Sequence, residues 1–194
     1  MSRKSPWICL FFICVLSLTD IVGRENNGPA LAGPPIQGKT YQFALPDSKV
    51  NLVIDLPGFQ MGGKVGPAHP YKKIEGINRE NGMIITGFFE PLDQRPPVHA
   101  PTPQAAREYH YTQGLARRSP LKSSEVRLSE SGPMALVDYL IEEYQGRRIM
   151  QKNYWAFLVQ DNVCIRLHLS KTSFKPGEEQ LFSTILSSIR FEAK

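Results

Sequence analysis

The chain has 194 residues, of which 41% are hydrophobic and 21% charged, and its formal net charge is +5. This composition excludes a disordered chain and is typical of one globular domain with a hydrophobic core. The basic residues are scattered rather than gathered in a run, so we expect no nucleic-acid partner despite the positive charge.

Residues 1–23 have the features of a signal peptide. Arg3 and Lys4 supply a positive start, residues 7–18 (WICLFFICVLSL) form a short apolar run, and Asp20 interrupts it. A helix that spans a bilayer needs about 20 apolar residues, so this run predicts export rather than a comfortable membrane span. We therefore expect an exported protein, periplasmic or extracellular.

Two cleavage positions fit the leader, one after Gly23 and one after Ala32. The alternative is an uncleaved leader, which is the one route by which we expect contact with a membrane. Cys9 and Cys14 lie within the leader, so the mature chain keeps only Cys164 and cannot form an internal disulfide.

The remainder divides into a linker and one domain. Residues 24–39 are polar and rich in Gly and Pro, which predicts a flexible linker, and the domain is expected at 40–194. Apolar alternation and turn residues predict the first strands, at residues 41–45, 50–56, 72–78 and 83–90.

A helix and then a three-stranded meander follow. Residues 91–103 contain five prolines and predict no regular structure, but Thr102 and Pro103 are a natural start for a helix that runs to about Arg117. Turns at Gln145-Gly146 and Asp161-Asn162 separate the last predicted strands, at residues 134–144, 147–160 and 163–170. A terminal helix then begins near Pro176, with Leu181, Ile185 and Ile189 on one side.

This order of elements predicts an α+β fold, a mainly antiparallel sheet with helices packed on it. The run VNLVIDLPG at residues 50–58, the meander, and LFSTILSSIRF at residues 181–191 resemble the PsbP-like superfamily, which includes the DcrB-like lipoproteins and the extrinsic subunit of photosystem II. The resemblance covers roughly residues 41–191. It implies an α/β/α sandwich and accessory or assembly roles without catalysis, and it carries no catalytic residue onto this chain.

Two-residue turns would give the meander two distinct faces. One face is expected to carry the core residues Val137, Tyr139, Ile141, Met150, Ala156, Leu158, Val163, Ile165, Leu167 and Leu169. The other is expected to carry Asp138, Glu142, Asn153, Trp155, Phe157, Cys164, Arg166 and His168. On it, Trp155 would lie opposite His168 and Phe157 opposite Arg166. Such a mixed face either binds a protein or a small anionic or aromatic ligand through stacking and cation–π contacts, or is covered by another element.

No residue pattern indicates an enzyme of a known type. Cys164 and His168 are four apart on one strand, roughly 13 Å between Cα atoms, which is too far for a nucleophile and its base. His69, His99 and His110 do not have the spacing of metal ligands, so we expect neither a metal site nor a cofactor. We therefore expect a non-catalytic accessory or binding protein of the cell envelope. The alternatives are a hydrolase-type enzyme whose site is assembled from dispersed residues, and a structural envelope protein held by its leader.

Overall fold

The computed structural model describes residues 39–62, 71–92, 101–112 and 126–194. The expected signal peptide and almost all of the expected linker lie outside these ranges. The first strand begins at Thr40, where the domain is predicted to start.

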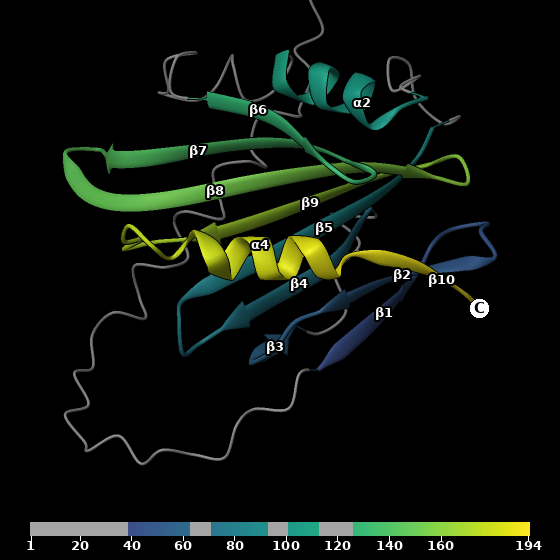
Figure 1. Ribbon diagram of the computed structural model, residues 1–194, viewed down its shortest axis with the longest axis horizontal. Coiled ribbons are helices and arrows are strands. Elements are labelled where there is room, and N and C mark those ends of the chain that lie inside the picture. The colour runs from purple at the N-terminus through teal and green to yellow at the C-terminus, as the bar shows by residue number, and fades with distance from the viewer. Residues whose placement is uncertain (1–38, 63–70, 93–100, 113–125) are drawn as a thin grey trace, which may run out of the picture. The chain divides into compact units, whose positions relative to one another are not determined.

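Two antiparallel sheets and two helices make up the described fold (Figure 1). The smaller sheet has the order β1 (Thr40–Ala44), β2 (Val50–Asp55), β10 (Arg190–Ala193). The larger has the order β3 (Phe59–Met61), β4 (Lys72–Asn78), β5 (Met83–Pro91), β9 (Val163–Lys171), β8 (Arg147–Gln160), β7 (Met134–Tyr144), β6 (Val126–Ser131). The helices are α2 (Pro103–His110) and α4 (Glu179–Ser188). The fold is thus α+β and mainly antiparallel, as predicted.

The two helices pack with different faces of the large sheet. Phe182, Ile185 and Leu186 of α4 belong to the main core, together with Ala156 and Leu158 of β8. Residues Trp155 and Phe157, which alternate with these along β8, belong instead to a second cluster with Ala106 of α2. Successive strand residues point to opposite faces, so α2 and α4 cover opposite sides of the sheet.

The amphipathic pattern of α4 correctly predicts its packing. Ile185 and Ile189 are buried in the main core, and Leu181 packs against it. Helix α2 also starts as predicted, with the Thr102 hydroxyl accepting a hydrogen bond from the amide of Ala105 and Pro103 at the first position. The expected continuation of this helix beyond residue 112 lies outside the described ranges.

Both turns of the meander are two-residue turns, as predicted. Tyr144 pairs with Arg147, and Gln160 pairs with Val163. Both residues of each turn have positive φ: 50° at Gln145 and 75° at Gly146 in the first, and 47° at Asp161 and 63° at Asn162 in the second. This is the geometry of type I′ turns, whose twist matches that of the strands.

The β7–β8 pair also contains a β-bulge. The register shifts by one residue between Ile141 and Glu143, and Met150 on the other strand has a φ of 45°. The segment after β9 supports the bulge, since the amides of Ser173 and Phe174 donate to the carbonyl oxygens of Ile149 and Met150. A shift of one residue reverses the faces of every β7 residue beyond it.

The bulge overturns the predicted faces of β7. Val137, Tyr139 and Ile141 do not lie on the main core face but pack in the second cluster, where Val137 pairs with Trp155. Asp138, expected beside Trp155, pairs with Tyr154 instead and so lies on the opposite side. The β8–β9 pairing has no such shift, so the predicted faces of β9 and of β8 from Asn153 onward hold. Met150, predicted on the core face, is instead a residue of the bulge and belongs to neither core cluster.

Candidate functional site

The four residues singled out from the sequence lie together on one side of β8 and β9. Trp155 pairs with His168 and Phe157 with Arg166, as alternation predicts. The rings of Trp155 and His168 stack with centroids 4.3 Å apart and planes 12° apart, and those of Trp155 and Phe157 are 6.5 Å and 22° apart. We call the side of the sheet that carries Trp155, Phe157, Arg166 and His168 the α2 face.

Helix α2 packs on the β7 and β8 part of this face (Figure 1). Phe157 is fully buried, Trp155 and Arg166 retain 5% and 7% of their surface, and His168 is partly buried. The α2 face is therefore a second core rather than an open surface. A partner would reach Trp155 and Phe157, which pack in the same cluster as Ala106 of α2, only if α2 moved.

A charged cluster lies beneath the end of α2. A guanidinium nitrogen of Arg166 donates to the Glu90 carboxylate, which comes from the neighbouring strand β5. The Arg166 guanidinium also lies over the ring of Phe88, 4.9 Å from its centroid. From α2, Nε2 of His110 lies 3.8 Å from the Glu90 carboxylate, and the His110 ring stacks on Phe157 at 5.7 Å.

Glu90 and His110 are the members of this cluster that the sequence does not reveal. Glu90 pairs with Cys164 in the β5–β9 register, and strands 70 residues apart carry no local signal of pairing. His110 is predicted on a helix, but which strand its ring meets depends on how that helix packs.

Burial holds the two histidines and the thiol of this region in their neutral forms. Burial, and after it the nearby positive charge of Arg166, together lower the pKa of His110 to about 2. Burial likewise lowers the pKa of His168 to about 4 and raises that of the Cys164 thiol to about 12. Neutral imidazoles and a protonated thiol fit packing rather than nucleophilic chemistry.

His168 ends a short chain of polar side chains. Its Nε2 lies 3.0 Å from the amide oxygen of Asn153, and that oxygen also accepts a hydrogen bond from Gln151. An oxygen can only accept, so Nε2 of His168 carries the proton and donates it. The chain fixes the tautomer of a ring that stacks on Trp155.

Three nitrogens at the boundary between α2 and the sheet have no hydrogen-bond partner in the described ranges. They are Nε of Arg107, Nε2 of His110 and Nε of Arg166. A buried donor or acceptor without a partner costs about 1–3 kcal/mol, so the packing of α2 on the sheet is less stable than it would be if these nitrogens were hydrogen-bonded.

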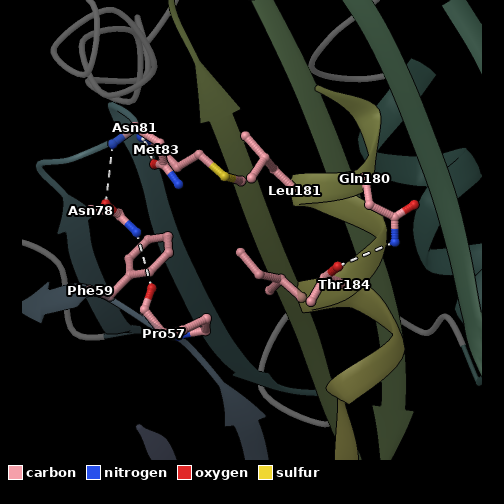
Figure 2. Close-up of a pocket in the computed structure, with 9 residues that line it drawn as sticks. Pro57, Phe59, Asn78, Asn81, Met83, Gln180, Leu181 and Thr184 are labelled. Carbon is pink, nitrogen blue, oxygen red and sulfur yellow. Dashed lines mark hydrogen bonds between the residues drawn. The ribbon is translucent and has the colours of Figure 1, made fainter. Parts of the chain in front are cut away.

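A small pocket of about 130 Å³ opens on the other side of the sheet, between α4 and strands β3 to β5 (Figure 2). It is lined by Pro57, Phe59, Asn78, Asn81, Met83, Gln180, Leu181, Thr184 and Ile185. The amide of Asn78 donates to the carbonyl of Pro57 and its oxygen accepts from the Asn81 backbone, so part of the polar rim is already bonded within the protein. The lining carries no charged side chain to fix a polar ligand.

In the described ranges, no three His, Cys, Asp or Glu side chains are grouped to hold a metal ion. No helix there is long and apolar enough to cross a bilayer. His69 and His99, two of the histidines weighed as metal ligands from the sequence, lie outside the described residues.

No protein-family model matches the chain, and no curated protein matches it. The solved structures that are similar to it include the following three, each at low identity. A Bacteroides thetaiotaomicron protein is 12% identical with a TM-score of 0.47, over 81% of this chain and 49% of that protein, so this chain spans about half its length. LpqN of Mycobacterium tuberculosis, described as involved in cell envelope biogenesis, is 9% identical with a TM-score of 0.41, over 80% of this chain and 90% of LpqN.

Cyanobacterial PsbP from Synechocystis sp. PCC 6803 is 11% identical with a TM-score of 0.49, over 89% of this chain and 99% of PsbP. A PsbP structure is therefore among those that this chain resembles, as its sequence patterns predict.

Proposed function

We propose that this chain is an exported, non-catalytic accessory or binding protein of the cell envelope. The observation that carries the proposal is the state of its reactive side chains. In the described ranges, Cys164, His110 and His168 are all held neutral by burial beside or beneath α2. A nucleophile and its base need exposure to substrate and matched pKa values; the thiol of Cys164 is fully buried, and the two partly buried histidines have pKa values far below that of a base active at neutral pH.

Export is proposed from the leader, with the mature protein in the periplasm or outside the cell. The positive start, the short apolar run and the two possible cleavage positions support it. The domain at residues 40–194 would then act on a protein or on a small anionic or aromatic ligand. We further propose that its layers form a PsbP-like α/β/α sandwich, since α2 and α4 pack on opposite faces of one sheet.

Mass spectrometry of the protein made in an exporting bacterial host tests the proposal. We expect a new N-terminus near Arg24 or Gly33 in the exported fraction. A matched variant, Phe12→Arg, places a charge in the apolar run and should leave the chain unprocessed in the cytoplasm. Membrane-bound protein that retains Met1 or Ser2 would support the tethered alternative and contradict cleavage.

Turnover assays with ester, peptide and phosphoester substrates test the non-catalytic part. We expect the full chain to show the same rate as a Cys164→Ser, His110→Gln variant, with neither above the buffer blank. Turnover that disappears in the variant would establish the hydrolase alternative and overturn the proposal, whatever the outcome for export.

A further inference from the structure

Helix α2 is attached to the sheet by few apolar contacts. Among its eight residues Ala106 alone is buried, and Tyr109 packs against the second cluster from a partly buried position. An isolated helix of this length is not stable in water, so its position depends on what it contacts. At that contact lie the three nitrogens of Arg107, His110 and Arg166 that have no partner in the described ranges.

His110, the last residue of α2, lies against the sheet at this contact. Its ring continues the stack of Phe157, Trp155 and His168 on the sheet. The ionisable groups that face it in the described ranges are Glu90 from β5 and Arg166 from β9, and two further titratable groups of β9 lie on the same side of the sheet, Cys164 and His168. Strand β8 contributes the uncharged ring of Phe157, and β7 contributes Tyr139, whose hydroxyl accepts a hydrogen bond from Trp155. On α2 itself, Arg107, Glu108 and Tyr109 are the ionisable neighbours.

The charges in this cluster balance only while His110 is neutral. The carboxylate of Glu90 already accepts from Arg166, so the two form one neutral pair. A proton on His110 would place a second cation beside that pair without a second anion among the facing groups. An uncompensated charge in a buried site is strongly unfavourable, whereas in water the imidazolium is well solvated.

We propose that α2 is an acid-released cover: protonation of His110 detaches the helix from the sheet and exposes the α2 face. The exposed surface would carry the rings of Trp155 and Phe157 beside the guanidinium of Arg166. Such a surface suits an aromatic or anionic group, so the cover would make binding there depend on pH. The release needs neither export nor a partner, and its failure would leave the proposed function untouched.

The direction of the pH effect follows from the two states of His110. In the closed state burial holds its pKa at about 2, and in the open state the value returns toward 6.5. The open state therefore binds the proton more tightly, and acid favours it. Below pH 6.5 the ratio of open to closed molecules should rise about tenfold for each pH unit.

Hydrogen exchange of the full chain, followed by mass spectrometry between pH 7.5 and 4.5, tests the release. After correction for intrinsic rates, amides of residues 103–110 should lose protection about tenfold per pH unit below 6.5, and at every pH they should be less protected than the amides of α4, which open only when the whole domain unfolds. In His110→Phe, which keeps a ring against Phe157 but binds no proton, the pH dependence of α2 protection should be weaker than in the wild type by about tenfold per pH unit, and any dependence that remains belongs to His168. His110→Gln serves the same purpose if the phenylalanine variant does not fold.

Labelling of Cys164 with 4,4′-dithiodipyridine, a disulfide reagent that reacts in acid, gives a second readout. Cys164 is fully buried in the same cluster as Ala106, so its labelling should accelerate with acid more steeply in the wild type than in the variants. Peptide mapping separates it from Cys9 and Cys14. Constant or tighter protection of α2 down to pH 4.5 would overturn the proposal. Equal pH dependence in the wild type and the variants would also overturn it, as would equal protection of α2 and α4 at every pH, since α2 would then open only with the whole domain.

Discussion

The pair of Arg166 and Glu90 is the most consequential contact at the scale of single residues. Arg166 is almost fully buried, so its removal would leave the Glu90 carboxylate with no strong partner among the described groups. Breaking a buried pair in this way typically costs about 3–5 kcal/mol. We expect Arg166→Ala to lose that much free energy of unfolding in urea titrations.

An exposed ion pair provides the control for this prediction. Arg127 binds Asp138 but keeps 70% of its side chain in water, and Lys152 lies 3.4 Å from the same carboxylate. Arg127→Ala should therefore cost no more than about 1 kcal/mol. Equal losses of unfolding free energy in Arg166→Ala and Arg127→Ala would show that Glu90 does not depend on Arg166 as its buried partner.

His168 should make stability depend on pH. Its pKa is lowered to about 4 in the folded chain, against 6.5 when unfolded, so the unfolded state takes up the extra proton. Stability is complete above pH 6.5 and should fall by about 1.4 kcal/mol per pH unit between 6.5 and 4. Urea titrations across this range should show that slope reduced by the same amount in His168→Gln. An unchanged slope would contradict the lowered pKa.

At the scale of elements, the bulge in β8 decides which side chains of β7 face which core. Met150 holds a φ of 45°, a conformation that costs a non-glycine residue about 1–2 kcal/mol. Met150→Gly should therefore be as stable as the wild type or up to about 1 kcal/mol more stable, whereas Met150→Val should be less stable. Thermal unfolding of both variants measures the difference.

The neighbouring residue supplies the comparison. The φ of Ile149 is not positive, so Ile149→Gly relieves no backbone strain and should lower the free energy of unfolding. A stabilising Ile149→Gly, or a destabilising Met150→Gly, would mean that the bulge lies elsewhere in the strand.

Helix α4 closes the main core, and Ile185 is its test residue. The side chain is 4% exposed and packs among the residues of the large sheet. Ile185→Ala should cost about 2–5 kcal/mol in chemical denaturation, the usual range for a buried isoleucine. The matched change Ser187→Ala, on the exposed side of the same helix, should stay within about 0.5 kcal/mol. A loss of less than about 0.5 kcal/mol in Ile185→Ala would show that this face of α4 does not pack in the core.

Sequence patterns predict the long elements well and the short ones poorly. The bounds of β7 and β8 follow from long runs of strand-forming residues that end at strong turn signals. β3 and β10 have three and four residues, too few for a periodic pattern, and β6 has no fully buried residue to mark a core face. The register of β8 and β9 is predictable because one tight turn sets it. The bulge is not, because it depends on contacts from residues after β9.

At the scale of the whole molecule, β10 joins the two ends of the described fold. It pairs with β2, and its Phe191 lies opposite Leu52 and packs against the main core. A chain that stops after Ile189 loses this strand and leaves β2 with β1 as its only neighbour in the small sheet. We expect it to lose about 2 kcal/mol or more in urea titrations, since truncation of a core phenylalanine alone costs 3–5 kcal/mol.

Arg190→Ala is the control, because its ion pairs with Asp55 and Glu192 are half exposed and the strand remains. It should change stability by less than about 1 kcal/mol. A truncated chain as stable as this variant would mean that β10 is dispensable.

The position of β10 also sets an order of assembly. A chain that emerges from a ribosome or a translocation channel presents β1 and β2 long before residues 190–193 appear. A two-stranded hairpin is marginal on its own, so the small sheet cannot be completed until its third strand arrives. Pairings between such distant segments also slow folding. The nascent domain would therefore stay open until its last strand has emerged, which is the state in which a chain can be threaded through a narrow pore.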